Sequence, residues 1–307
     1  MVEIELLYPL VSAAAFSISS AMIREMDYLG TPILLNFFRT LIGAVIFLSI
    51  LLFSNQIIEP FRIGFMLVVF LILSVLFNVV FGDTLYFDAQ TKLGVKVATP
   101  IVNTFPFFTV LGAVIFLGET FSSSFFVSSV FVLGGVIFLS LDENIISDIE
   151  GPNASKNDKI VGLVFAFTAV LCYTLGVIFV TLGSEGLNSV VVNSVRLPAG
   201  TILLALVLFQ ATKKQKRKED SGAFKPHKIN KKDVSKLLIA GTLGTFVSSL
   251  FLVLSVQEIG AGRTSVLVST GPLFSLPLAI FWLKEKLSKF TIVGTFMTLL
   301  GLYLVLT

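Results

Sequence analysis

The chain has 307 residues, of which 55% are hydrophobic and only 13% are charged, with a formal net charge of +3. A soluble domain carries about 25% charged residues, and the mean hydropathy of +0.95 also departs from that class. The apolar residues form long runs between short charged clusters, and runs of about 18 residues or more indicate membrane spans. The composition therefore excludes an ordinary soluble domain and predicts an all-α membrane protein.

Ten transmembrane helices are predicted, each long enough to cross a hydrocarbon core of about 30 Å. Helix is the expected form, because a segment surrounded by lipid must satisfy its own backbone hydrogen bonds. The N-terminus lacks a basic region, so the first span is expected to be retained rather than cleaved as a signal peptide. In chain order the predicted spans are 4–22, 32–53, 63–90, 95–117, 121–141, 160–182, 188–210, 237–257, 263–283 and 288–307.

Two connections between the predicted spans are longer than the rest. Residues 142–159 are acidic and contain Gly151-Pro152, so they are expected to link two halves of the chain. Residues 211–236 are strongly basic. We interpret this segment as a cytoplasmic loop beside anionic lipid rather than as a nucleic-acid site.

The residue types that carry most enzyme chemistry are scarce. Cys172, the only cysteine, lies in an apolar run, and His227, the only histidine, lies in the basic loop. A metal site and an intramembrane Ser/His or Cys/His pair are therefore not expected. The phosphate-binding pattern Gly-x-x-x-x-Gly-Lys-Ser/Thr is also missing from the sequence. We expect no cofactor and no enzymatic activity.

The second half of the chain repeats the first. Asn36-Phe-Phe-Arg39 aligns with Asn193-Ser-Val-Arg196 at an offset of 157 residues, and further along the offset becomes 166. We therefore expect a first five-helix repeat (1–141), a linker (142–159) and a second five-helix repeat (160–307). The pairs at the second offset are Gly94/Gly260, Pro106/Pro272, Glu119/Glu285, Ser122/Ser288 and Gly135/Gly301.

The odd number of helices in each predicted repeat has a geometrical consequence. Two units of five helices in tandem must enter the membrane in opposite directions, which makes them inverted repeats. Inverted repeats are the usual basis of alternating access, with the substrate near the midplane where the repeats meet.

These features together resemble a known family. The Asn-x-x-Arg in the second helix of each repeat, the Pro in the fourth, and the segments around Glu119 and Glu285 resemble the drug/metabolite transporter superfamily, in its EamA-type branch. The resemblance covers the whole chain, although Lys284 stands where the first repeat has Gly118. It implies a ten-helix secondary transporter, often an exporter of amino acids or other small metabolites, in the cell membrane.

Charged residues inside spans are costly, by about 2.5–3.5 kcal/mol on insertion scales, and are therefore functional candidates. Arg39 and Arg196 lie well inside spans. They are expected either to attract a carboxylate group of a substrate in a central cavity, or to stabilise the fold by bonding to helix ends or the interface. Their presence in both repeats favours the structural role.

Asp83 gives two conflicting expectations. The apolar run 63–82 already spans a membrane, which would put Asp83 at the surface, whereas the repeat pairs it with Ser249 in the middle of the eighth span. The repeat register favours burial. A buried Asp83 could carry a proton as the coupling ion, or it could simply pair with Arg39.

Other polar positions within spans could line a cavity or join helices. Pro106 and Pro272 are expected to kink their helices beside that cavity, because proline removes a backbone hydrogen bond. The full set of candidate substrate-binding or cavity residues is Asn36, Arg39, Asn78, Asp83, Tyr86, Asn103, Asn193, Arg196, Ser249 and Ser269.

Two further questions stay open at this point. A non-transporting scaffold or sensor is the alternative function, and it predicts that no cavity lies between the halves. Of the 22 Lys and Arg residues, 18 lie in or beside odd-numbered connections, which the positive-inside rule places in the cytoplasm with both termini outside. The resemblance implies the opposite, with both termini inside. We expect termini outside, and a monomer or homodimer.

Overall fold

The computed structural model describes residues 4–54, 56–140, 156–216, 230–271, 273–274 and 289–306, and every regular element in them is helical. The elements are η1 (Ile4–Leu6), α1 (Leu7–Arg24), η2 (Asp27–Leu29), α2 (Pro32–Phe53), α3 (Glu59–Arg62), α4 (Phe65–Val75), η3 (Leu76–Asp83), α5 (Thr84–Leu93), α6 (Val95–Val102), α7 (Phe105–Leu117), α8 (Ser123–Ser140), α10 (Lys156–Gly183), α11 (Ser189–Lys216), α12 (Lys231–Gly241), η5 (Thr242–Val247), α13 (Ser248–Val268) and α15 (Lys289–Leu306).

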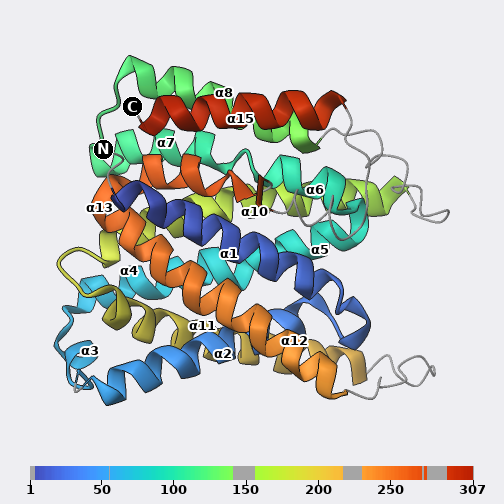
Figure 1. The fold of residues 1–307 in the computed structure, drawn as a ribbon. Helices are drawn as coiled ribbons and strands as arrows, with labels where there is room; N and C mark the ends of the chain where they lie inside the picture. The colour runs from blue at the N-terminus through green and yellow to red at the C-terminus, as the bar shows by residue number, and fades with distance from the viewer. Residues whose placement is uncertain are drawn as a thin grey trace.

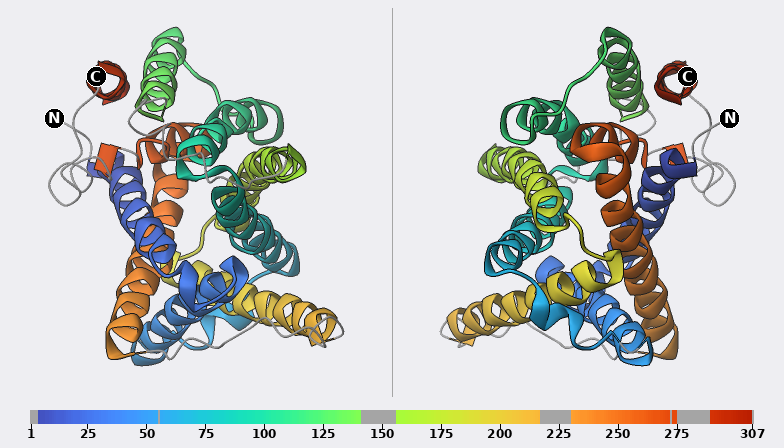
Figure 2. Two further views of the ribbon diagram at one scale, coloured as in Figure 1. Left: turned by 90° about the vertical axis from the view of Figure 1, so that its right-hand side faces the viewer. Right: turned by 90° about the vertical axis from the view of Figure 1, so that its left-hand side faces the viewer.

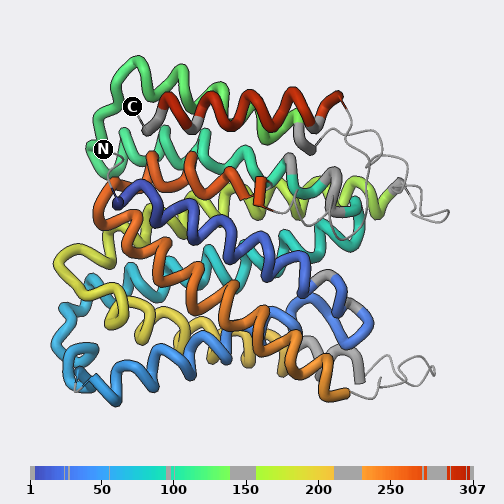
Figure 3. Tube along the Cα trace, in the orientation of Figure 1, coloured from blue at the N-terminus to red at the C-terminus, as the bar shows by residue number. Residues whose placement is uncertain are grey.

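The helices lie lengthwise in the bundle, several of them tilted across their neighbours, as Figure 1 shows, and the chain runs back and forth between the two ends of the bundle. In views along the axes, α8 and α15 pack against each other at one edge (Figure 2). The other long helices surround the centre, where α1 packs on α13, α10 on α4 and α5, and α2 on α11. The tube in Figure 3 traces this path.

Among the described residues, six helical stretches are long and apolar enough to cross a membrane, and three shorter apolar helices accompany them. The predicted span 32–53 coincides with α2, and the predicted span 160–182 lies within α10. The ninth predicted span, 263–283, extends beyond the described residues, so the count of ten helices stays a prediction. The chain is nevertheless a multi-pass helical membrane protein.

The outer surface of the bundle is apolar, as a lipid-facing surface must be. On α2, Val45, Leu48 and Leu52 are between 44% and 57% exposed, and on α7 Ile115 and Phe116 are about 70% exposed. A water-soluble monomer rarely exposes apolar patches larger than a few hundred Å². Many hydroxyl side chains and a few amide and charged ones are instead buried inside the bundle.

The predicted span 95–117 is not one continuous helix, and its interruption lies just before Pro106, whose kink stays a prediction. The helix is interrupted at Asn103–Thr104, and Pro106 lies at the start of α7. The first turn of a helix tolerates proline, because a backbone N–H has no partner there in any case. Ser269–Thr270 form the corresponding turn in the second half. Pro272 lies outside the described residues.

The two halves share further backbone features at the offset found in the sequence. Gly94 and Gly260 have φ of 80° and 81°, a conformation that favours glycine, and each interrupts a helical stretch. The π-helical segments η3 and η5 begin at Leu76 and Thr242, again 166 residues apart. π-Helical turns are rare and often lie at functional sites, so this shared feature directs attention to the centre of the bundle.

Candidate substrate cavity

A cavity of about 470 Å³ lies at the centre of the bundle. Cavities that hold small molecules typically enclose about 300–1,000 Å³. Its lining comes from both halves of the chain: α1, η3, α5, α6 and α7 from the first, and α10, η5 and α13 from the second. Half of the predicted site residues line it, namely Asn78, Asp83, Tyr86, Asn103 and Ser249.

The five remaining predicted residues are buried outside the lining, and four of them are bonded to neighbouring helices. Asn36 donates to the Val79 carbonyl at 2.8 Å, and Asn193 donates to the Ser249 carbonyl at 3.2 Å. The Ser269 hydroxyl donates to a carbonyl of its own helix. Direct substrate contact by these residues, and by Arg39 and Arg196, stays a prediction.

Asp83 is buried at the end of η3, as the repeat register predicts and the length of the apolar run does not. Asp83 is only 2% exposed. One carboxylate oxygen forms an ion pair with Arg39 of α2. The other accepts a hydrogen bond of 2.7 Å from the hydroxyl of Tyr173 on α10. A buried carboxylate is costly unless it is paired and hydrogen-bonded, and here helices of both halves meet that requirement.

Two aromatic rings also contact the Arg39 guanidinium. The guanidinium carbon lies 5.4 Å from the ring centre of Phe16 and 5.2 Å from that of Phe87. Cation–π contacts of this kind stabilise a desolvated guanidinium by about 2 kcal/mol. The Nε and Nη1 atoms have no hydrogen-bond partner in the described part of the chain. Phe16 also lines the cavity, so its ring separates Arg39 from that space.

Arg196 occupies the equivalent position in the second half but has different partners. Its Nε donates to the Ser74 hydroxyl at 2.8 Å, and its Nη1 donates to the Asn193 side chain at 3.1 Å. Both partners are neutral. The first half has the matching contact from Arg39 to Asn36, at 3.1 Å. The Asn-x-x-Arg motif therefore forms the same internal bond in both halves. Of its two arginines, only Arg39 pairs with a carboxylate in the described residues.

Polar contacts join the halves at one end of the cavity. Lys236 of α12 donates to Glu25 at 2.7 Å, and Tyr28 donates to Asp233 at 2.6 Å. Glu25 directly follows α1 and lines the cavity, and its side chain is 62% exposed. These contacts connect the α1–α2 segment with the start of α12, where the cavity approaches solvent.

A second contact between the halves involves Glu119, for which the sequence analysis gave only its match with Glu285 in the second repeat. Its carboxylate accepts hydrogen bonds from the backbone N–H of Ala261 at 2.6 Å and of Gly262 at 3.1 Å. These groups follow the break at Gly260 and begin a helical segment, where free N–H groups favour an anion. Glu119 therefore caps a helix of the other half.

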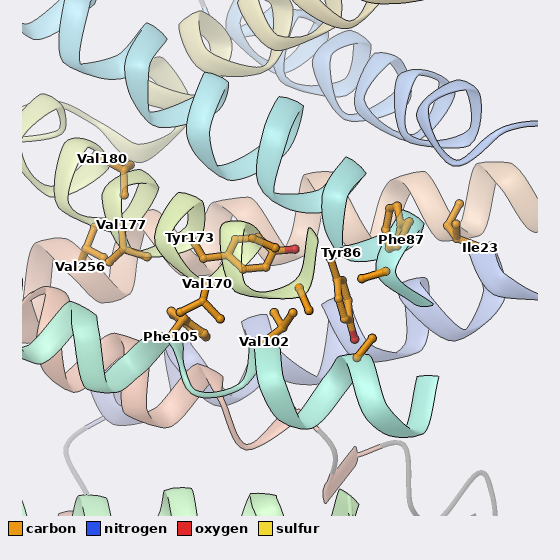
Figure 4. Packing of buried hydrophobic residues seen from close by; sticks show 14 of the residues in the cluster. Ile23, Tyr86, Phe87, Val102, Phe105, Val170, Tyr173, Val177, Val180 and Val256 are labelled. Atoms are coloured by element: carbon orange, nitrogen blue, oxygen red, sulfur yellow. The ribbon is translucent and has the colours of Figure 1, made fainter. Parts of the chain in front are cut away.

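Sequence reasoning missed several lining residues. Tyr173 was overlooked because a tyrosine in a hydrophobic run resembles core packing, yet Figure 4 shows it beside Tyr86 and Phe105 at the centre of the bundle. The hydroxyls of α1 were also missed, since serine can bond to its own helix and gives a weak signal. They are Ser12, Ser17 and Ser20. A count of polar residues on one face of the first span could have found them.

A helical bundle that crosses the membrane and encloses a central cavity, lined by polar and apolar side chains of both halves, is the class that this fold and site define. The model of the EamA-like transporter family matches residues 4–141 and 160–307. The chain therefore belongs to the EamA-like transporter family and has its two-repeat architecture. It is a membrane transporter with a small-molecule substrate.

Individual relatives agree with this assignment without naming a substrate. An uncharacterized transporter of Archaeoglobus fulgidus is 23% identical over 99% of this chain and 98% of its own length. Uncharacterized transporter YetK of Bacillus subtilis is 34% identical over 24% of this chain and 22% of its own. A solved crystal structure superimposes with a TM-score of 0.74 at 16% identity, over 99% of this chain and 96% of that one. This last likeness concerns the fold alone.

Proposed function

We propose that the chain is a secondary active exporter of small metabolites such as amino acids, working by alternating access between two inverted five-helix repeats. The observation that carries the proposal is the central cavity, which is lined by α1, η3 and α5 of one half and by α10, η5 and α13 of the other. A site between two halves becomes accessible from either side when the halves rock against each other.

The directions of the helices support the inverted arrangement. In Figure 1, α1 runs from left to right, whereas α10, which begins the second half, runs from right to left. The matched glycines and matched π-helical segments support an equivalence between the halves, with boundaries at residues 1–141 and 160–307. Ten spans would be needed for this arrangement, with residues 142–159 as the linker.

Two other functions are weaker candidates. A scaffold or sensor gives no reason for a cavity of about 470 Å³ with polar lining from both halves. An intramembrane enzyme would need a reactive constellation, for which the sequence offers a single cysteine and a single histidine. His227 lies outside the described residues.

Coupling, orientation and assembly complete the proposal. Asp83, buried beside the cavity and paired with Arg39, is the candidate proton carrier. The distribution of Lys and Arg supports termini outside the cell membrane, with the 211–236 segment in the cytoplasm. We expect a monomer or homodimer.

Counterflow in proteoliposomes tests the function. Vesicles containing the purified chain are preloaded with one unlabelled metabolite at a time, and uptake of trace label is measured against empty vesicles. We expect uptake above the empty vesicles for at least one member of a panel of amino acids, amines and organic acids. Uptake equal to the control for the whole panel, with the protein shown to be folded, would contradict the transport function.

A further inference from the structure

The charged side chains around the cavity are arranged so that carboxylates line it and their cationic partners do not. Among the described residues the lining contains two ionisable acids, Asp83 and Glu25, and neither lysine nor arginine. Each acid has a cationic partner that is not part of the lining: Arg39 for Asp83, and Lys236 for Glu25. Both ion pairs therefore present their negative ends to the cavity.

This orientation changes the electrostatic energy of a charged ligand in the cavity, although the net charge of each ion pair is zero. Charge–charge interactions weaken with distance, so a ligand in the cavity interacts more strongly with the near carboxylates than with the cations behind them. The Phe16 ring further separates Arg39 from the cavity. A positively charged ligand is stabilised by this arrangement, and a negatively charged one is destabilised.

The remaining lining suits an organic cation rather than a bare metal ion. Among the described residues, four aromatic rings line the cavity, those of Phe16, Tyr86, Phe105 and Tyr173. Tyr173 lies at the centre of this group, with ring centres 6.4 Å from Tyr86 and 5.8 Å from Phe105 (Figure 4). Aromatic faces attract ammonium groups and also pack against apolar bodies.

One buried hydroxyl in the lining is ready to bind a ligand. The Ser20 Oγ has no hydrogen-bond partner in the described part of the chain, and its residue is only 8% exposed. A buried polar atom without a partner costs free energy, which a ligand N–H or O–H would recover. This observation is independent of the charges and indicates that the cavity is built for a polar ligand.

We propose that the cavity selects small organic cations, such as primary amines with an aromatic or aliphatic body, over anions of similar size. This proposal rests on the transport function and specifies its substrate class. The ammonium group lies towards the carboxylates of Asp83 and Glu25, and the apolar body rests against the aromatic rings.

Three probes that share one aromatic body test the proposal: tyramine, which is a cation, tyrosol, which is neutral, and 4-hydroxyphenylacetate, which is an anion. Their dissociation constants for the purified full chain in detergent are measured by titration calorimetry at neutral pH. We expect tyramine to bind about tenfold more tightly than tyrosol, and the anion to bind most weakly. Equal or tighter binding of the anion, or no binding of tyramine, overturns the proposal.

Two variants locate the effect. Glu25→Gln at the exposed end is expected to fold normally and to reduce the tyramine-to-tyrosol ratio severalfold, while Glu258→Gln, an exposed change outside the lining, leaves it unchanged. Asp83→Asn is expected to reduce the ratio further, with Asp88→Asn as its control on α5. If the ratio in folded Glu25→Gln and Asp83→Asn protein equals that of the original chain, the proposal is overturned.

Transport assays separate this inference from the function on which it rests. Proteoliposomes that accumulate the anion but not the amine would keep the transporter and remove the cation selectivity. A chain that binds tyramine with the expected preference but moves none of the panel compounds would keep the selectivity and remove the transport function.

Discussion

The Tyr173 hydroxyl donates a hydrogen bond of 2.7 Å to the Asp83 carboxylate, although the two residues lie 90 positions apart and belong to different halves of the chain. Both side chains line the cavity. This bond joins the two halves at the cavity wall. The pair therefore connects the stability of the bundle with the geometry of the cavity.

Tyr173→Phe should therefore destabilise the fold. The substitution removes one donor from a buried carboxylate and leaves its acceptor unsatisfied, at a cost of about 1–3 kcal/mol. Thermal unfolding in detergent measures the effect, with Tyr8→Phe on α1 as the matched loss of a hydroxyl outside the cavity lining. Equal melting temperatures for the two variants would show that the bond does not stabilise the folded state.

Arg39→Ala and Arg196→Ala should differ, despite their equivalent positions in the repeats. Removal of Arg39 leaves the buried Asp83 carboxylate without its cation, which costs about 3–5 kcal/mol in comparable pairs. Removal of Arg196 breaks two bonds to the neutral residues Ser74 and Asn193, at about 1–3 kcal/mol. Thermal stability and transport per folded molecule are measured for each variant.

A double variant shows whether the ion pair is the cause of that difference. Asp83→Asn should recover part of the stability lost in Arg39→Ala and none of that lost in Arg196→Ala. Equal loss of folded protein in both single variants, with normal transport by the remainder, would leave only a shared structural role for the two arginines.

Glu119→Ala should loosen the contact between the halves. The backbone N–H groups of Ala261 and Gly262 lose their acceptor, and loss of a helix cap costs about 1–2 kcal/mol. Glu258→Ala removes an exposed acid of the same type and should leave the melting temperature nearly unchanged. If the two variants melt together, the cap contributes nothing measurable.

Asp83→Asn should abolish accumulation driven by a pH gradient if Asp83 is the proton carrier. Exchange of the same compound at equal pH on both sides should continue, with weaker binding of cations. The readout is uptake into proteoliposomes with and without an imposed gradient, with Asp88→Asn as the control. Unchanged dependence on the gradient would remove Asp83 from the coupling step and favour uniport or exchange.

The sequence predicted the helical class of the fold and the burial of Asp83, because both depend on local or repeated patterns. A long apolar run defines α2 without any tertiary information, and the repeat register placed Asp83 inside the bundle when span length alone did not. The sequence could not show which side of a helix faces the cavity. Arg39 lies behind the lining because Phe16 and Asp83 stand before it, and that arrangement depends on how helices of both halves pack.

The π-helical segments were also out of reach from the sequence. Nothing in the composition of η3 distinguishes its hydrogen-bond pattern from that of an ordinary helix. At Gly176, α10 packs so closely against η3 that a Cβ there would lie 2.7 Å from the Cβ of Asn78. Such close contact between α10 and η3 is a property of the packed pair, and either helix alone gives no sign of it.

Orientation in the membrane gives the last prediction, and labelling at the two ends of the bundle decides it. The connection that contains α3 and the start of α12 lie at opposite ends in Figure 1. Cys172, the only cysteine, is buried, so a cysteine introduced at Glu59 or at Lys232 would be the accessible thiol. Because 18 of the 22 Lys and Arg residues lie in or beside odd-numbered connections, the positive-inside rule places Lys232 in the cytoplasm.

Glu59→Cys should then react with a membrane-impermeant maleimide in intact cells, and Lys232→Cys only after permeabilisation. Labelling of Lys232→Cys in intact cells, with Glu59→Cys protected, would reverse the assignment and place both termini inside.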